Sequence, residues 1–286
     1  QLERIINARF HIAVLLNIFP NHLDRHGSME NYFSAKQKIF ANQRKEDIAI
    51  INLTYPQWIA RSVSGIKSQL VTFSAMRILQ EGYFWDQNRL CKKKDGIEKT
   101  LFHISDWNLP GRHNLENLTC ATAICCEAGI DPDAIASSLG SFQGLPHRLE
   151  KVYEIEGISF FNDSKSTTPS ATKVALEALN GPIILIMGGR AKVKDFSELT
   201  ATLNPDRVKA IILFGESAPL IYKSLSDFPV LSICNNLEEA VEQAFLKASK
   251  GDSILLSPGC TSWDQYKNFE ERGEHFKNIV HGLAKS

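Results

Sequence analysis

The chain has 286 residues, 32 basic and 32 acidic side chains, and a formal net charge of zero. This length is sufficient for two domains of ordinary size, while the balanced charge argues against nucleic acid or a membrane surface as the main partner. No apolar run approaches the ~20 residues that a membrane-spanning helix needs, and no signal peptide is visible, so we expect a cytoplasmic protein, most simply a monomer.

The first part of the chain alternates between apolar runs and helical patterns, which predicts an α/β domain. The nearly continuous apolar run at residues 10–19 is typical of a strand buried on both faces. Ser28 is placed to cap the helix that follows. The predicted strands are residues 10–19, 48–52 and 70–73, and the predicted helices are residues 29–41 and 56–64.

Between residues 81 and 103 the pattern changes to two alternating runs around a polar segment. Its Asp95-Gly96 pair is a hairpin turn signal, and we expect the three preceding lysines to form part of a solvated turn rather than a binding patch. These lysines are Lys92, Lys93 and Lys94. The two helices predicted after the hairpin run through Leu118 to a stop at Gly129, and from Asp131-Pro132 to about Gly140.

From about residue 145 onward, short apolar runs alternate regularly with helical patterns. This alternation predicts a mostly parallel, doubly wound sheet of Rossmann-like type. Residues 141–148 are the best candidate for a linker, so we place the two domains at 1–144 and 145–286. The predicted strands are 158–161, 183–187, 210–214 and 253–256, and the predicted helices are 169–179, 196–203, 218–225, 237–248 and 265 to near the end.

The stretch from Asn162 to Pro169 is the most informative in the chain. It lies where a predicted strand ends and a helix begins, with Thr168 as the expected N-cap and Pro169 as the first helical residue. Backbone N–H groups and the helix dipole attract anions at such a position in an open α/β sheet.

Polar residues follow three of the predicted strands in the second half. They are Asp163, Ser164 and Lys165; residues 188–192, which include Arg190 and Lys192; and residues 257–262. Because the carboxyl ends of parallel strands lie along one edge, we expect these loops to line one crevice. The cationic side chains there suit carboxylates or phosphates. Ordinary polar, capped loops are the alternative interpretation.

Glu3, His22 and Asp24 are candidates for a metal site in the first half. Mg²⁺ prefers oxygen ligands, so His22 would be an unusual ligand and the spacing alone is weak evidence. Lys36 lies in a predicted helix, where a lysine is normally solvated. Composition and spacing therefore indicate an α/β enzyme or binding protein for an anionic small molecule, and leave the choice open.

The six cysteines show no Cys-x-x-Cys pair. Buried, reduced thiols are the expected state, rather than disulfides or metal ligands. The chain also lacks an initiator Met and starts without a capping or turn signal, so we expect it to begin inside a longer sequence.

Four motifs together resemble the Mur ligases of peptidoglycan synthesis: HLDRHGSMENY at residues 22–32, GRHN at 111–114, PHR at 146–148 and NDSK at 162–165. The first motif is common to the whole family. The segments NDSKST at 162–167 and LSPGCTSWDQYKNFEERG at 256–273 are more particular to the branch that adds D-glutamate. A diaminopimelate- or lysine-adding ligase would be expected to show an Asp-Tyr-Ala-His type segment near residues 162–165.

The resemblance implies a three-domain enzyme with a UDP-binding domain, a central ATPase domain and a Rossmann-like C-terminal domain. The central domain of the family carries a Gly-x-x-x-x-Gly-Lys-[Ser/Thr] phosphate loop, which this sequence does not contain. We therefore expect a truncated central ATPase α/β domain followed by the C-terminal domain, and we expect the chain by itself to be inactive.

The family uses ATP and Mg²⁺ to convert a substrate carboxylate into an acyl phosphate, which the amine of D-glutamate then attacks. The resemblance implies UDP-N-acetylmuramoyl-L-alanine and D-glutamate as substrates. Glu3, His22 and Lys36 match the metal site, and Lys36 matches a lysine that becomes carbamylated. Together with Lys165, His22 and Lys36 form the implied catalytic set. The implied nucleotide residues are Asn114, Asn117, Arg148 and Asp163, and the implied D-glutamate residues are Lys165, Thr167, Lys192, Ser262 and Phe269.

Two other functions stay open from the sequence. One is a related ATP-dependent amide ligase, such as a folylpolyglutamate synthase or another Mur ligase, although the segments at 162–167 and 256–269 count against it. The other is an inactive protein that only binds nucleotide or amino acid, which the missing phosphate loop favours.

Overall fold

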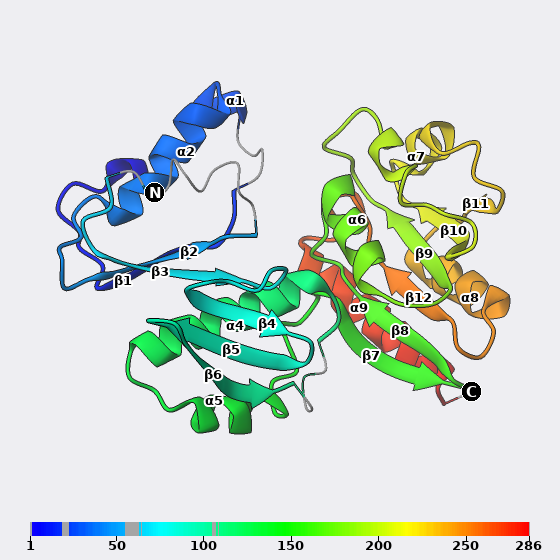
Figure 1. The fold of residues 1–286 in the computed structure, drawn as a ribbon. Helices are drawn as coiled ribbons and strands as arrows, with labels where there is room; N and C mark the ends of the chain where they lie inside the picture. Colours follow the sequence, from blue (N-terminus) through cyan, green and yellow to red (C-terminus); the bar gives the residue numbers. More distant parts are fainter. Residues whose placement is uncertain are drawn as a thin grey trace. The chain divides into compact units, whose positions relative to one another are not determined.

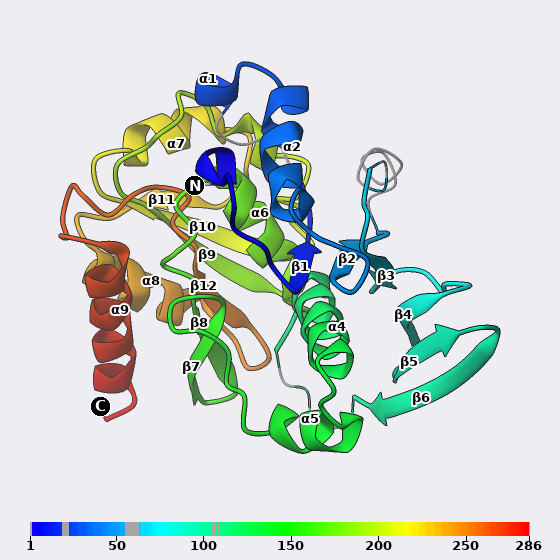
Figure 2. The same ribbon diagram turned by 90° about the vertical axis from the view of Figure 1, so that its left-hand side faces the viewer.

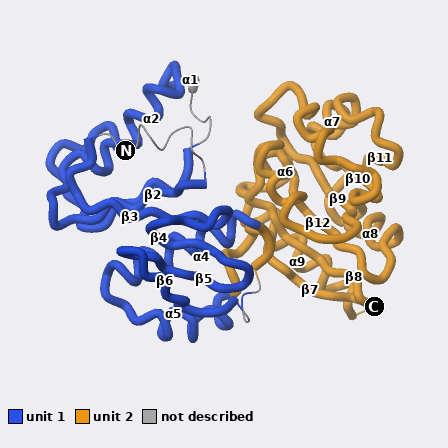
Figure 3. Tube along the Cα trace, in the orientation of Figure 1, with its two compact units in different colours: residues 1–108, 112–142 blue, residues 109–111, 143–286 orange. Residues whose placement is uncertain are grey.

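The computed structural model describes residues 2–18, 23–54, 63, 65–104, 107 and 109–285. The chain divides into two compact units (Figure 3). Unit 1 comprises residues 1–108 and 112–142, and unit 2 comprises residues 109–111 and 143–286. Each unit is built around its own six-stranded sheet (Figure 1).

The sheet of unit 1 has its strands in sequence order. β1 (Ile12–Leu15), β2 (Ile48–Asn52), β3 (Gln69–Ser74) and β4 (Gly82–Asp86) run parallel, while β5 (Arg89–Lys94) and β6 (Ile97–His103) add an antiparallel extension. The predicted strand 10–19 is too long, because only four of its residues pair with β2. Both faces of the strand pack against apolar clusters, with Ala13 and Leu15 buried and Ile12 and Val14 partly buried, so the prediction of burial on both faces is confirmed in part.

The expected hairpin turn is present, but the three lysines lie outside it. The two-residue turn consists of Asp95 and Gly96, both with positive φ, whereas all three lysines belong to β5. Lys92 is structural: its Nζ lies 2.8 Å from Oε1 of Glu127 and 5.0 Å from the ring centroid of Tyr83. The Tyr83 hydroxyl donates to the same carboxylate oxygen, so Glu127 connects β4 and β5 to the helix at Arg112–Glu127.

Two helices of unit 1 begin at the predicted capping residues. Ser28 Oγ accepts a hydrogen bond from the N–H of Asn31, and Asp131 caps its helix in the same manner. The described helices are α1 (Leu23–His26), α2 (Met29–Gln37), α4 (Arg112–Glu127) and α5 (Pro132–Leu139), with 3₁₀ turns at Leu2–Arg4 and Lys38–Phe40. The predicted helix 56–64 lies outside the described residues except for Val63.

Unit 2 has a doubly wound sheet, as expected. Its order is β11-β10-β9-β12-β8-β7, and every pairing is parallel except that of β7 with β8. The strands are β7 (Glu150–Ile155), β8 (Ile158–Asn162), β9 (Ile183–Gly188), β10 (Val208–Phe214), β11 (Leu231–Ile233) and β12 (Ser253–Leu256). The last strand therefore lies between two strands that come much earlier in the chain.

Helices cover both faces of this sheet (Figure 2). One buried apolar cluster packs α6 (Pro169–Ala178) and α7 (Ala218–Ser224) against one face. A second cluster packs α8 (Leu237–Lys247) and α9 (Phe269–Leu283) against the other. Thr168 caps α6 and Pro169 is its first residue, as predicted.

Several predicted elements of unit 2 differ from the structure. The expected helix 196–203 is only a 3₁₀ turn at Ser197–Leu199. The last helix begins at Phe269 rather than at residue 265, since Asn268 Oδ1 accepts from the N–H of Glu271 and fixes the start there. The strands β7 and β11 were not predicted. Among the described residues, no helix is long and apolar enough to cross a membrane.

All six cysteines are free thiols in the structure. Four are buried and two are partly exposed.

Candidate functional site

Three loops of unit 2 meet at one edge of its sheet. They follow β8, β12 and β9, which are neighbours in the sheet, so the prediction of a common edge is confirmed. Backbone hydrogen bonds join the loops to each other: Gly259 N–H donates to Ser166 O at 2.9 Å and Gly188 N–H donates to Pro258 O at 3.0 Å. We call residues 163–168, 189–192 and 257–262 the three edge loops.

Two glycines after β9 allow close backbone approach, Gly188 to Phe214 at the end of β10 and Gly189 to Thr261 in the loop after β12. Gly188 and Gly189 have φ of +143° and +124°, which side-chain-bearing residues rarely adopt. A Cβ on Gly189 would lie 2.2 Å from the carbonyl oxygen of Thr261. Immediately beyond, Arg190 and Thr261 exchange two backbone hydrogen bonds of 2.8 and 2.9 Å.

The edge loops carry two exposed ammonium groups, on Lys165 and Lys192. Nζ of Lys192 donates to Oγ1 of Thr167 at 3.2 Å, and Nζ of Lys165 lies 4.8 Å from the ring centroid of Phe269. The structure thus brings these four residues of the implied D-glutamate set together in two pairs. Ammonium groups and a hydroxyl at one edge form a suitable environment for carboxylates.

Ser262, the fifth residue of that set, lies on the third edge loop. Its side chain is almost entirely enclosed, with the residue only 2% exposed. Its carbonyl oxygen accepts the N–H groups of Gln265 and Tyr266, which closes a turn ahead of α9. Ser262 therefore lies in the enclosed wall formed by the third edge loop and is not exposed at the surface.

Asp163 is buried and already hydrogen-bonded through both carboxylate oxygens. Oδ1 accepts the N–H of Leu149 at 3.2 Å, and Oδ2 accepts the hydroxyl of Ser257 at 2.8 Å. Burial raises the pKa of Asp163 to about 6, against an ordinary value of 3.8, although these hydrogen bonds oppose the rise. Asp163 joins the first edge loop to the third and to the segment that bears Arg148.

Arg148 is exposed between two buried neighbours with left-handed backbone conformations. His147 has φ +62° and Leu149 has φ +47°, both unusual for residues with side chains. The N–H of Lys165 donates to His147 O at 3.1 Å, which fixes this segment to the first edge loop. Such backbone strain is often found at functional sites, where surrounding contacts maintain it.

The structure adds Arg272, a residue that the sequence reasoning did not select. It lies in the first turn of α9 and is fully buried. Its guanidinium donates hydrogen bonds to Ser164 and Cys260 in two of the edge loops, and to Gly188 at the end of β9, just before the third. The sequence carried one signal: Arg272, Phe276 and Val280 are spaced by four residues, so the arginine occupies the apolar stripe of its helix.

The implied nucleotide residues are divided between the two units. Asn114 and Asn117 lie three residues apart on α4 of unit 1, and therefore on one face of that helix. Arg148 and Asp163 belong to unit 2. The structure defines each pair within its own unit.

Glu3 and Lys36 line a common pocket of about 460 Å³ in unit 1, together with Arg25, His26 and Tyr32. The carboxylate of Glu3 accepts from the guanidinium of Arg25 and lies 3.3 Å from Nδ1 of His26. Among the described side chains of this pocket, Glu3 supplies a carboxylate, and Arg25 and Lys36 supply cations. His22 lies outside the described residues, as does the side chain of Asp24, and the part of the chain that is described holds no cluster of three metal-ligating side chains. The metal site stays a prediction.

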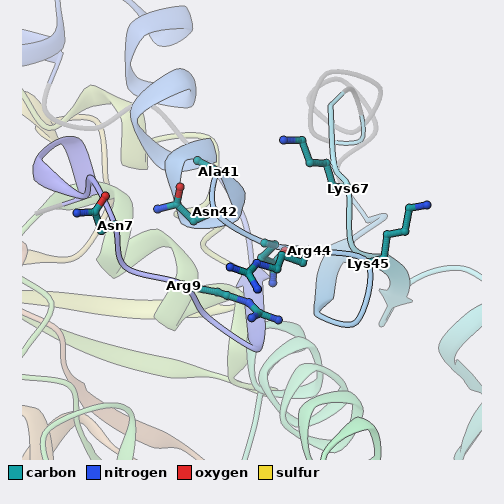
Figure 4. Close-up of a pocket in the computed structure, with 8 residues that line it drawn as sticks. Asn7, Arg9, Ala41, Asn42, Arg44, Lys45 and Lys67 are labelled. Atoms are coloured by element: carbon teal, nitrogen blue, oxygen red, sulfur yellow. The ribbon is translucent and has the colours of Figure 1, made fainter.

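A larger pocket of about 650 Å³ in unit 1 is lined by basic side chains, but these do not point toward a common centre (Figure 4). Arg9 is bound to Asp47 and Glu46. Lys45 and Lys67 extend in different directions (Figure 4). This pocket therefore gives less support for a site than the edge loops of unit 2.

Sequence comparisons match both parts of the chain to known domains. Residues 1–125 match the Mur ligase middle domain, and residues 147–260 match the Mur ligase glutamate ligase domain. The UDP-N-acetylmuramoylalanine–D-glutamate ligase of Alkaliphilus oremlandii is 42% identical over 100% of this chain, and that of Geobacillus kaustophilus is 44% identical over 99%. The chain spans 63% and 62% of the lengths of these two relatives.

Solved structures agree on the fold. The MurF ligase of Thermotoga maritima in complex with ADP is similar with a TM-score of 0.68, at 19% identity, over 97% of this chain and 64% of that one. A MurF structure from Acinetobacter baumannii gives a TM-score of 0.69 at 19% identity, over 96% of this chain and 60% of that one.

Proposed function

Because the chain belongs to the Mur ligase family, we propose that it serves the ATP-dependent addition of D-glutamate to UDP-N-acetylmuramoyl-L-alanine in peptidoglycan synthesis. The observation that carries this proposal is the pairing of Lys192 with Thr167 and of Lys165 with Phe269 at one sheet edge. D-Glutamate has two carboxylates and one amine, so two separate cations complement it. The relatives at 42% and 44% identity bear the name of this ligase.

In the proposed reaction, a carboxylate oxygen of the acceptor attacks the γ-phosphorus of ATP, and ADP leaves. The amine nitrogen of D-glutamate then attacks the acyl carbon, the nitrogen loses a proton, and inorganic phosphate leaves as the amide bond forms. We propose that Lys165 and Lys192 hold the carboxylates of D-glutamate, so that its amine faces the acyl phosphate. Orientation of this kind lowers the barrier because the reacting groups are already placed.

Phe269 and Thr167 would restrict the two ammonium groups. A cation above an aromatic face is attracted to it, so the ring of Phe269 keeps Lys165 extended over α9. Thr167 does the same for Lys192 by a direct hydrogen bond. Ser262 would contribute as a nearby hydroxyl in the enclosed wall.

For the nucleotide, we propose Arg148 as the phosphate contact, while nucleotide binding by Asn114 and Asn117 of unit 1 stays a prediction. Asp163 stays in this set. A carboxylate offers about four lone-pair positions, so the internal hydrogen bonds from Leu149, Ser257 and Ser166 leave room for one hydroxyl donor. Its internal bonds also hold Leu149, and thereby the backbone on which Arg148 is presented.

We propose that Mg²⁺ accompanies ATP, because phosphoryl transfer needs the phosphate charge neutralised. A bifunctional folylpolyglutamate synthase/dihydrofolate synthase is similar in fold, with a TM-score of 0.63 at 18% identity. The structure of that protein is a complex with AMPPNP and Mn. The described residues do not form a ligand set, so the roles of Glu3, His22 and Lys36 stay predictions. The domain boundary between residues 144 and 145, the monomeric state and the cytoplasmic location are likewise proposals.

Calorimetric titration of the chain with D-glutamate tests the proposed substrate, with L-glutamate and L-lysine as controls. We expect binding that prefers the D-isomer. Equal binding of both glutamate isomers, or preference for lysine, would favour another amide ligase. Incubation of the chain with ATP, UDP-N-acetylmuramoyl-L-alanine and D-glutamate, followed by assay of phosphate, tests the separate expectation that the chain by itself is inactive. Phosphate release that requires both substrates would contradict that expectation and support the ligase function directly.

A further inference from the structure

The most unusual buried group in unit 2 is the guanidinium of Arg272. The residue is 0% exposed, yet it forms no ion pair with a carboxylate among the described residues. Every acceptor that it contacts is a neutral oxygen. Burial lowers the pKa of Arg272 to about 10, so the group still carries its charge at neutral pH. A buried charge with no carboxylate in direct contact is costly, and the hydrogen bonds of Arg272 and the more distant charge of Asp264 offset the cost.

These hydrogen bonds reach three separate segments. Nε donates to Ser164 Oγ at 3.0 Å and Nη2 donates to Ser164 O at 2.9 Å, on the loop after β8. Nη2 also donates to Cys260 O at 3.0 Å, on the loop after β12, and Nη1 donates to Gly188 O at 3.3 Å, at the end of β9. One planar group thus fixes the spacing of all three.

The contacted residues lie one to four residues before the proposed substrate contacts. Ser164 precedes Lys165, Cys260 lies two residues before Ser262, and Gly188 lies four residues before Lys192. The Ser164 hydroxyl in turn donates to Phe269 O at 2.8 Å, which links the same group to the ring beneath Lys165. A displacement of the guanidinium would therefore change the positions of several substrate contacts together.

The surrounding backbone is shaped to admit this side chain. A Cβ on Gly189 would lie 2.9 Å from Nη1 of Arg272, so glycine is needed there for the close approach. The next residue of α9, Gly273, faces His147, where a Cβ would lie 2.1 Å from Nδ1. The start of α9 thus contacts both the edge loops and the segment that carries Arg148.

We propose that Arg272 is a positioning residue: its guanidinium sets the relative positions of Lys165, Lys192 and Ser262 and thereby the affinity for a dicarboxylic amino acid. This inference rests on the proposed function for the identity of the ligand. Arg272 itself is buried and touches no ligand. Its planar fork of five N–H donors matches four acceptor contacts in fixed directions, which a lysine ammonium cannot reproduce.

The test is R272K, which retains the charge and loses the fork. Arg207 supplies a matched control, because its Nη2 donates to two backbone carbonyls, Leu176 O and Leu179 O, both at 2.9 Å. Arg207 lies before β10, at the opposite end of the strands from the edge loops. The variant R207K therefore loses comparable hydrogen bonds to backbone carbonyls in the same unit, but away from the edge loops.

We expect R272K to weaken D-glutamate binding about tenfold, the effect of misplacing one charge-assisted contact, while R207K leaves the affinity within twofold. Hydrogen–deuterium exchange should rise in all three edge loops in R272K. Thermal unfolding of both variants shows whether they are equally destabilised. Should R272K fail to fold, S164A removes one anchor of the same guanidinium and is expected to give the same pattern in weaker form.

Three outcomes decide the inference. Unchanged affinity in a folded R272K would overturn it, as would an equal loss in R207K at equal destabilisation, since that would be a general effect of stability. If the wild-type chain does not bind D-glutamate, the proposed function fails instead, and the exchange pattern decides the role of Arg272. Faster exchange confined to α9 would then refute it.

Discussion

Oδ1 of Asp163 accepts a hydrogen bond from the backbone N–H of Leu149, with an N–O distance of 3.2 Å. This bond joins a carboxylate at the end of β8 to a residue 14 positions earlier, which itself has a left-handed backbone conformation. The carboxylate is therefore a structural link as well as a candidate nucleotide contact, and its ionisation affects stability.

The variant D163N should change the pH dependence of stability between pH 4 and pH 7. Burial raises the pKa of Asp163 in the folded state to about 6, so the folded state holds the proton more tightly than the unfolded state, whose value is near 3.8. The contribution is therefore present at low pH and is lost as the pH rises through 6. We expect the stability of the wild type relative to D163N to fall by about 2 kcal/mol over this range.

Thermal or urea unfolding of both proteins at each pH measures this difference. Asparagine keeps one acceptor and cannot ionise, so groups elsewhere cancel in the comparison. A constant difference across the range would show that Asp163 ionises with an ordinary pKa.

The variant K192A should lower affinity for D-glutamate by about ten- to a hundredfold, because it removes a charge-assisted contact worth roughly 1.5–3 kcal/mol. Lys192 is exposed, so thermal stability should stay unchanged. Lys194, also exposed and two residues away, is the matched control. Calorimetric titration of K192A and K194A distinguishes a local contact from a general loss of charge: equal effects of the two variants would contradict the assignment. ADP binding should be unaffected in both.

The variant S262A should weaken D-glutamate binding less than K192A does. It removes a neutral hydroxyl, for which a hydrogen bond contributes about 1 kcal/mol. The residue is 2% exposed, so the change also tests whether the enclosed wall contacts the ligand at all. Unaltered D-glutamate affinity in S262A would assign Ser262 to the wall alone.

Two glycines of α9 should respond to alanine with opposite signs. In a helix, alanine is normally more favourable than glycine by about 0.8–1 kcal/mol. A Cβ at Gly282 meets nothing within 4 Å, so G282A should stabilise slightly, by less than this amount near the helix end. At Gly273 the Cβ would lie 2.1 Å from Nδ1 of His147, so G273A should destabilise by roughly 1–3 kcal/mol. Urea unfolding of the pair checks the sign; a stabilising G273A would mean that His147 has room to move.

A second glycine pair separates backbone strain from steric conflict. Gly189 and Gly251 both have positive φ, at +124° and +95°, but a Cβ on Gly251 meets nothing within 4 Å. We expect G251A to cost about 1 kcal/mol from strain alone, and G189A to cost roughly 3 kcal/mol or more, because Thr261 O and Arg272 obstruct the new methyl group. Equal losses of unfolding free energy would exclude the close approach of the loops.

The sequence by itself determined much of the α/β framework. The strands at Ile48–Asn52 and Ser253–Leu256 were predicted with the observed bounds, and Thr168 was identified as a cap. These features depend on local properties, namely apolar runs and capping side chains, which are readable over a few residues. The common edge of three loops also followed, because parallel strands align their carboxyl ends.

The tertiary structure decided what depends on distant partners. β7 was missed because its alternation is weak and it is defined by pairing with β8. Lys92 was assigned to a solvated turn, but its contacts with Glu127 and Tyr83 fix it to the sheet. The role of Arg272 depends on hydrogen-bond acceptors up to 108 residues away in sequence. The hydrogen bonds of a buried polar group are made wherever the fold places acceptors, and sequence spacing does not encode that location.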